Sequence, residues 1–304
     1  MTADPVEGQA PTRCGFCAII GAPNAGKSTL VNQLTGSKVS IVSHKVQTTR
    51  ARIRAIAMEG RAQIVLVDTP GIFKPRRQLD RVMVENAWAG AGDADVILLL
   101  VDGRPGLTDE AKAIIAGLPV GRANVILVIN KIDLMGRERL LEVASDFGAA
   151  FAFDRVFMVS ALTGSGTADV LAYLAARMPE GPWLYPKDQV ADVQLRFMAA
   201  EMTREKIYER LHEELPYAST VETEGWEENK DGSVKISQII YVQRDSQKAI
   251  VLGKGGQSVK LIGQLARAEM EKQFRRRVHL FLFVKVREGW PEDKERLRNM
   301  GLDV

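Results

Sequence analysis

Short apolar runs alternate with amphipathic stretches over the first 178 residues of the chain, and this alternation constrains the fold more than any other feature. The apolar runs are rich in Val, Ile and Leu and mostly apolar on both faces, as strands are in a sheet that is covered on both sides. Between them, apolar residues recur at helical spacing. The pattern predicts a doubly wound α/β domain over residues 14–178. Its predicted strands are 17–21, 52–58, 62–68, 95–102, 124–131 and 155–161.

A different order of elements begins after residue 178. The stretch PEGPWLYPKD holds three prolines, which can neither continue a helix nor donate to a sheet, so it predicts a linker over 179–191. Residues 192–304 are expected to form a second domain, a smaller α+β layer with helices over one sheet. Residues 1–13 are expected to be a flexible extension. The second domain is predicted to hold a helix at 195–215, strands at 219–228, 233–244 and 278–286, and a helix from Ser258.

Composition excludes several classes of protein. A length of 304 residues accommodates two ordinary domains, and 46% hydrophobic with 26% charged residues is close to the average of soluble globular proteins. No apolar run approaches the roughly 18 residues that span a bilayer, and the first residues do not resemble a signal peptide. A cytoplasmic protein is therefore expected.

The two cysteines, Cys14 and Cys17, have the C-x-x-C spacing of thioredoxin-like redox sites. They lie inside an apolar run that predicts a strand, where positions three apart face opposite sides of the sheet. The three histidines are scattered along the sequence, which argues against a zinc site. A structural role for both cysteines is the favoured interpretation.

A first glycine loop, GAPNAGKST, follows the first predicted strand and precedes a predicted helix. Gly21, Gly26, Lys27 and Ser28 complete the pattern G-x-x-x-x-G-K-S/T. Backbone N–H groups of such a loop can surround a β-phosphate because the glycines leave no side chain in the way. The lysine adds a positive charge at the β- and γ-phosphates, and the serine hydroxyl can bind Mg²⁺. The loop predicts a nucleoside triphosphate site.

Three motifs further along the chain complete the site, and the last two of them narrow the nucleotide to guanine. Asp68 ends a predicted buried strand and can reach Mg²⁺ through water, while Gly71 can bring a backbone N–H to the γ-phosphate. In NKID, the Asp133 carboxylate can accept from both N1–H and the exocyclic amine of guanine, a pair of donors that adenine lacks. In SAL, residues 160–162, a backbone N–H can read the guanine carbonyl. Each motif follows a predicted strand.

All these motifs, in this order, resemble the translation-factor-related class of GTP-binding proteins, which implies GTP or GDP and Mg²⁺ as cofactors. The resemblance assigns nucleotide binding to Gly21, Asn24, Ala25, Gly26, Lys27, Ser28, Thr29, Asn130, Lys131, Asp133, Ser160, Ala161 and Leu162. It assigns catalysis to Lys27, Thr49, Asp68 and Gly71, and Mg²⁺ binding to Ser28, Thr49 and Asp68.

Finer features of that class bear on catalysis. In KVQTTRARI, Thr49 matches the threonine that closes over Mg²⁺ when the γ-phosphate is present, with Thr48 as the alternative. Ile72 stands where Ras-like proteins have the glutamine that orients the attacking water, so intrinsic hydrolysis is expected to be slow. Asn24 matches the asparagine that helps to hold K⁺ in the potassium-activated members of the class.

A second glycine loop, Gly253-Lys254-Gly255-Gly256, lies in the most basic part of the chain, with ten bases and two acids between Lys248 and Arg287. The loop lacks the G-K-S/T ending, so it is not another nucleotide loop. A G-x-x-G turn between two helices over a sheet resembles the KH module, whose loop clamps the backbone of about four unpaired nucleotides. A plain helix connection and a solvated basic face are the alternatives. The predicted RNA-binding residues are Lys248, Gly253, Lys254, Gly255, Gly256 and Lys260.

The element order helix–strand–strand–helix–helix–strand is that of a type II KH domain. Together with the GTP-binding motifs and the GPWLYP linker, it makes the chain resemble the Era GTPases over nearly its whole length. The resemblance implies a ribosome-assembly factor that binds the 3′ end of 16S rRNA and assists maturation of the 30S subunit, with GTP favouring RNA binding. It also implies peripheral association with the inner face of the cell membrane. A monomer is expected.

Two other interpretations stay open from the sequence. A GTPase that serves tRNA modification, or one with two GTP domains, is disfavoured because the chain lacks a second nucleotide loop and a C-terminal cysteine. An RNA-binding scaffold that binds GTP without hydrolysing it is kept open by Ile72.

Overall fold

The computed structural model describes residues 11–119 and 124–304, which cluster into two compact units. The first unit contains the described residues up to Ser40, together with Arg52–Lys74 and Val84–Asp192. The second unit contains Ile41–Ala51, Pro75–Met83 and Val193–Val304. Most of the predicted extension lies outside the described residues, and the first strand begins at Arg13.

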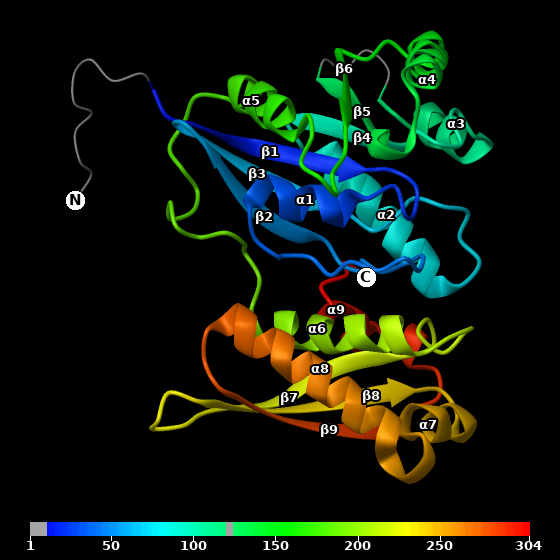
Figure 1. Cartoon of the computed structure of the whole chain (residues 1–304), viewed down its shortest axis with the longest axis vertical. Helices are drawn as coiled ribbons and strands as arrows, with labels where there is room; N and C mark the ends of the chain where they lie inside the picture. Colours follow the sequence, from blue (N-terminus) through cyan, green and yellow to red (C-terminus); the bar gives the residue numbers. More distant parts are fainter. Residues whose placement is uncertain (1–10, 120–123) are drawn as a thin grey trace. The chain divides into compact units, whose positions relative to one another are not determined.

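The first unit contains a six-stranded sheet in the order β2-β3-β1-β4-β5-β6 (Figure 1). β2 is antiparallel to β3 at one edge, and the other pairs are parallel. The prediction of a doubly wound sheet is confirmed, with one antiparallel edge strand. The strands are β1 (Arg13–Ile20), β2 (Ile53–Glu59), β3 (Ala62–Asp68), β4 (Val96–Asp102), β5 (Val125–Asn130) and β6 (Arg155–Val159).

Helices cover both faces of this sheet. Neighbouring residues of β1 point into different cores: Ile19 packs with Leu30 and Leu174 from α1 and α5, and Ile20 packs with helices on the other face. This two-sided burial explains why the strands are apolar throughout. The helices are α1 (Lys27–Thr35), α2 (Gln78–Gly92), α3 (Asp109–Ala116), α4 (Arg137–Ala150) and α5 (Thr167–Arg177).

The two cysteines lie in β1, as the strand interpretation predicts. Cys17 is fully buried in the core, and burial raises the pKa of its thiol. A redox site needs an accessible thiol with a lowered pKa, so this environment favours a structural role.

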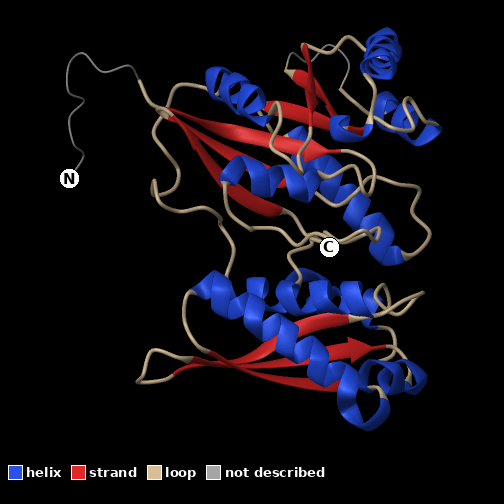
Figure 2. Ribbon diagram, in the orientation of Figure 1, coloured by secondary structure: helices blue, strands red, loops and turns tan. Residues whose placement is uncertain are grey.

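The second unit is a three-stranded sheet in the order β7-β8-β9, with helices packed on one face (Figure 2). β7 (Thr220–Glu228) and β8 (Val234–Val242) are antiparallel, and β8 and β9 (Val278–Val286) are parallel. The predicted α+β layer and its order of elements are confirmed. The helices are α6 (Leu195–Arg210), α7 (Asp245–Leu252), α8 (Gln257–Phe274) and α9 (Lys294–Asn299), with 3₁₀ turns η2 (Lys254–Gly256) and η3 (Trp290–Glu292).

α6 ends at Arg210, before the predicted end at residue 215. The ammonium of Lys45 donates to the carbonyl oxygens of Tyr208 and Leu211, at the end of this helix. A helix that ends here leaves its last carbonyls without backbone N–H partners. The Lys45 ammonium supplies the hydrogen bonds that a further helical turn would have made.

Two short segments from the first half of the chain belong to the second unit. Leu79, Val82 and Met83 share a buried cluster with Trp290 and Leu297. The sequence prediction assigned these segments, with the rest of 14–178, to the nucleotide-binding domain. No described helix is both long and apolar enough to cross a bilayer.

Candidate nucleotide site and RNA-binding loop

The first glycine loop joins β1 to α1 in a conformation that only glycine adopts easily. Gly21 has φ 153° and Gly26 has φ 100°. A Cβ on Gly21 would lie 2.1 Å from the Leu100 carbonyl oxygen, and one on Gly26 would lie 2.3 Å from Asn130 Nδ2. No side chain caps the N-terminus of α1. Its first N–H groups are therefore available to an anion, as a phosphate site requires.

Lys27 and Asp68 place opposite charges in the buried base of this site. Lys27 Nζ donates to the carbonyl oxygens of Gly21 at 3.1 Å and Ala22 at 3.0 Å. Burial lowers the pKa of Lys27 to about 8, although the charge of Asp68 opposes the shift. Burial also raises the pKa of Asp68, against the influence of Lys27, Ser28 and Ser40.

Asp68 is the residue of this site whose surroundings best fit a metal ligand. Its carboxylate is fully buried, and neither oxygen accepts a hydrogen bond of good geometry from the described residues. A buried carboxylate without such partners is costly unless a cation compensates it. The Ser28 hydroxyl lies close enough to affect the Asp68 pKa. Hydroxyl and carboxylate oxygens are the ligands that Mg²⁺ takes, so these residues fit the metal that the sequence predicts.

Asn130 ties three loops of the site together. Its side-chain amide donates to the Ala25 carbonyl at 2.8 Å, and its Oδ1 accepts from the N–H groups of Lys131 at 2.8 Å and Ala161 at 2.9 Å. Asn130 is 2% exposed, so its role in this structure is to hold the loops in register. The sequence motif alone assigned it to nucleotide binding.

The part of the site predicted to bind guanine contains a hydrogen-bonded lysine, Lys131, and an exposed carboxylate, Asp133. Lys131 Nζ donates to the Asn24 carbonyl at 2.7 Å and to Asp102 at 2.8 Å. Burial opposes ionisation of Asp102, but hydrogen bonds from Arg104 and Lys131 prevail and lower its pKa to about 2. Asp133 is exposed, as a group that reads a guanine edge must be. Sequence reasoning missed Asp102, although it ends β4 as Asp68 ends β3.

The backbone after Asp68 passes against the first loop. A Cβ on Gly71 would lie 2.9 Å from the Pro23 nitrogen, and the Ile72 N–H donates to the Gly21 carbonyl at 3.0 Å. The Ile72 side chain is 7% exposed and packs in the core. Thr49 lies on the segment Ile41–Ala51, which belongs to the second unit, whereas Ser28 and Asp68 belong to the first. Binding of Mg²⁺ by Thr49 therefore stays a prediction.

The second glycine loop turns from α7 into α8 with its glycines facing open space. Gly255 has φ 58° and Gly256 has φ 77°, and a Cβ on either would meet no atom within 4 Å. Gly253 is different, because a Cβ there would lie 2.7 Å from the Ser258 Cβ. No side chain caps the N-terminus of α8. The N–H groups of Gly256 and Gln257 donate within the turn, so the loop offers an approaching phosphodiester chain close access to its backbone at Gly255.

Cationic and apolar side chains surround this loop. Lys254 and Lys260 are exposed, and Lys248 is half-buried. Ile250 on α7 is 58% exposed and Leu261 on α8 is 41% exposed, and sequence reasoning did not assign either to the site. Their helical positions flank the loop, where apolar surface can cover an unpaired base.

The RRR run at 275–277 is partly structural. Arg275 ends α8 with φ 52°. Arg276 pairs with Glu228 at 3.1 Å and lies over the ring of Trp226.

Comparisons with known proteins give a family match for each of the two domain types. Residues 16–131 match the family model "50S ribosome-binding GTPase", and residues 214–291 match "KH domain". A crystal structure of Era in complex with MgGDPNP and nucleotides 1506–1542 of 16S ribosomal RNA is 36% identical, covers 96% of this chain and 100% of its own, and has a TM-score of 0.91. A variant of Aquifex aeolicus Era bound to GDP and AlF₄⁻ is 35% identical, with the same coverage and TM-score.

Curated relatives are similar over nearly their full lengths. GTPase Era of Rhizobium meliloti is 61% identical over 99% of this chain and 96% of the relative. GTPase Era of Bradyrhizobium sp. is 57% identical over 100% of this chain and 99% of the relative. With both glycine loops in place and this identity over nearly the whole length, the chain belongs to the Era family of GTPases.

Proposed function

We propose that this GTPase is a ribosome-assembly factor that binds the 3′ end of 16S rRNA, assists maturation of the 30S subunit, and grips RNA more tightly with GTP than with GDP. The observation that carries the proposal is the open glycine loop at Gly255 and Gly256, in a chain of the same fold as an Era that holds MgGDPNP and 16S rRNA nucleotides.

The nucleotide site is proposed to use its residues as follows. The loop from Gly21 to Thr29 surrounds the phosphates, and Asp133 with the 160–162 loop selects guanine. Ser28, Asp68 and Thr49 hold Mg²⁺, which neutralises charge on the β- and γ-phosphate oxygens when it is bound. The Lys27 ammonium interacts with the same oxygens, and the Gly71 N–H donates a hydrogen bond to the γ-phosphate.

Hydrolysis is proposed to be slow without an activator. The Ile72 side chain is buried and carries no polar atom, so it cannot orient the attacking water as the Ras-like glutamine does. We propose that RNA or a K⁺ ion near Asn24 supplies the stimulation. Replacing K⁺ by Na⁺ at equal ionic strength is expected to lower GTP turnover, and equal rates in the two salts would reject the potassium site.

The RNA site is tested by a change at Gly255. Gly255→Asp puts a side chain and a negative charge where the RNA backbone is to approach, and strains a residue at φ 58°. Binding to a single-stranded RNA with the small-subunit 3′ tail sequence is expected to fall by at least about 100-fold, a loss of about 3 kcal/mol.

Gly232→Asp is the matched control, because Gly232 has φ 82° in the same unit and also faces open space. It adds the same charge and similar strain in the β7–β8 turn, and is expected to bind RNA as the wild type does. Equal losses in both variants would mean that Gly255 acts only through folding, and no loss in Gly255→Asp would remove the RNA site from this loop.

The scaffold interpretation, in which the nucleotide domain binds GTP without hydrolysing it, is disfavoured because the chain belongs to a family of GTPases. Turnover measured with and without the RNA and with 30S subunits separates the two. Stimulated turnover supports the timed assembly factor, and negligible turnover in all conditions supports the scaffold. Membrane association and the monomeric state stay predictions from the resemblance.

A further inference from the structure

The segment Ile41–Ala51 carries the predicted switch threonine, Thr49, and clusters with the second unit although both of its flanking stretches belong to the first. Its contacts run along α6. The Val42 N–H donates to Glu205 at 2.9 Å, the Arg204 guanidinium donates to the Thr48 carbonyl, and Lys45 binds carbonyls at the end of the helix. The segment is therefore attached at several points to the unit that holds the RNA loop.

Arg50, next to Thr49, is a further attachment and is also buried. It is 2% exposed, and its guanidinium donates to the carbonyl oxygens of Ser219 at 2.8 Å, Pro216 at 3.2 Å and Tyr217 at 3.2 Å. It also donates to the Tyr208 hydroxyl at 3.0 Å. These four acceptors surround the planar fork of an arginine, a geometry that a lysine cannot reproduce.

Aromatic rings complete the surroundings of this guanidinium. Its carbon lies 5.9 Å from the centre of the Tyr208 ring and 5.6 Å from that of Trp290. Both distances are within the range of cation–π attraction. Removing the Arg50 guanidinium from these buried partners would be costly in free energy. Arg50 therefore holds the backbone of the adjacent Thr49 to the second unit.

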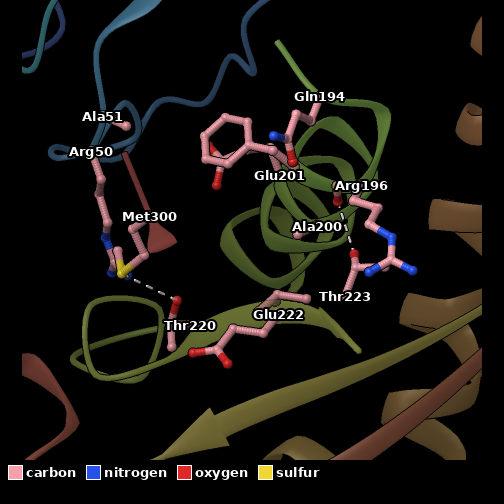
Figure 3. Close-up of a pocket in the computed structure, with 12 residues that line it drawn as sticks. Arg50, Ala51, Gln194, Arg196, Ala200, Glu201, Thr220, Glu222, Thr223 and Met300 are labelled. Carbon is pink, nitrogen blue, oxygen red and sulfur yellow. Dashed lines mark hydrogen bonds between the residues drawn. The ribbon is translucent and has the colours of Figure 1, made fainter. Parts of the chain in front are cut away.

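A cavity of about 270 Å³ lies beside this arginine, with Thr220 and Met300 also in its wall (Figure 3). Packing around Arg50 is thus incomplete on one side.

We propose that Arg50 is a positioning residue that fixes the switch threonine to the RNA-binding unit and so couples nucleotide state to RNA affinity. The proposal rests on the proposed function and names the residue that transmits the coupling. When Thr49 moves to or from Mg²⁺, it takes Arg50 and the attached unit with it. Because coupling between two ligands is reciprocal, RNA bound at the second loop biases Thr49 by the same factor.

The test measures the ratio of RNA affinities with a non-hydrolysable GTP analogue and with GDP. Couplings of this kind usually span about 5- to 150-fold, and the wild type is expected in that range. In Arg50→Met the ratio is expected to fall below about 2-fold, while GDP affinity and nucleotide-free RNA affinity stay within about 3-fold of wild type. Arg50→Lys keeps the charge without the fork and is expected to restore only part of the ratio.

Arg210→Met is the matched control, because Arg210 is exposed on the same helix as Tyr208. It is expected to keep the wild-type ratio. Lys45→Met, at a half-buried position of the same segment, provides a second variant if Arg50→Met does not fold, and is expected to lower the ratio in the same direction.

The outcomes separate the inference from the function on which it rests. A wild type that binds RNA equally in both nucleotide states contradicts the proposed GTP control, and the inference falls with it. A wild-type ratio that survives in a folded Arg50→Met, or in Lys45→Met where the first variant does not fold, overturns the inference alone.

Discussion

The two glycine loops of this chain both suit phosphate, but their surroundings differ. In the first, a Cβ at Gly21 or Gly26 would collide with neighbouring atoms at 2.1 and 2.3 Å, whereas in the second a Cβ at Gly255 or Gly256 would meet nothing within 4 Å. The first loop has a buried lysine and a buried carboxylate beneath it, and exposed lysines flank the second. An enclosed loop suits a small ligand bound on all sides, and an open loop suits a passing chain.

The largest effect is expected from removing the buried positive charge of the first loop, which should change nucleotide affinity and leave RNA affinity unchanged. Lys27→Ala removes the buried ammonium from the phosphates and is expected to lower GDP affinity by at least about 100-fold, or about 3 kcal/mol. RNA affinity without nucleotide is expected to stay within about twofold. Nucleotide and RNA titrations check this, with the exposed Lys112→Ala as control. Loss of both affinities would mean that the two loops do not act separately.

A smaller effect is expected at the residue that joins the loops of the first site. Asn130→Ala leaves the Ala25 carbonyl and two backbone N–H groups without their partner, which is expected to cost about 1–3 kcal/mol of unfolding free energy. GDP affinity should fall with it, by about tenfold. Urea unfolding and GDP titration measure the two. Unchanged stability with full GDP affinity would mean that the three loops hold their places independently.

The pH dependence should also distinguish the loops. The Lys27 pKa is lowered to about 8 from 10.5, so between these values the unfolded chain binds more protons at this lysine than the folded one. Raising the pH through that window therefore stabilises the nucleotide-free protein and discharges the lysine. GDP affinity is expected to fall by up to about tenfold per pH unit above pH 8. RNA affinity of the nucleotide-free protein, measured in parallel, is expected not to fall in this way above pH 8. A flat GDP profile to pH 9.5 would contradict the assigned role of Lys27.

The smallest effect concerns one exposed cation of the open loop. Lys254→Ala is expected to weaken RNA binding a few-fold and to reduce the slope of log affinity against log salt concentration by about 0.7, because one fewer phosphate is neutralised. RNA titrations from low to high salt measure the slope. A wild-type slope in the variant would show that Lys254 does not contact phosphate.

Local patterns were enough to predict much of this molecule. The strand before GAPNAGKST, the helix after it and the element order of the second unit follow from apolar periodicity and glycine spacing, which depend on neighbouring residues. The attachment of Arg50 does not, because its acceptors at Tyr208 and Ser219 lie 158 and 169 residues away. The bridging role of Asn130 was hidden for the same reason: its partners, Ala25 and Ala161, lie on loops far from it in sequence.

The central claim is that the enclosed loop controls the open one. The most direct test is the dissociation constant of the wild-type protein for the small-subunit 3′ tail RNA, measured at one salt concentration with a non-hydrolysable GTP analogue and with GDP. We expect binding to be at least about fivefold tighter with the analogue than with GDP. Equal constants in the two nucleotide states would contradict it.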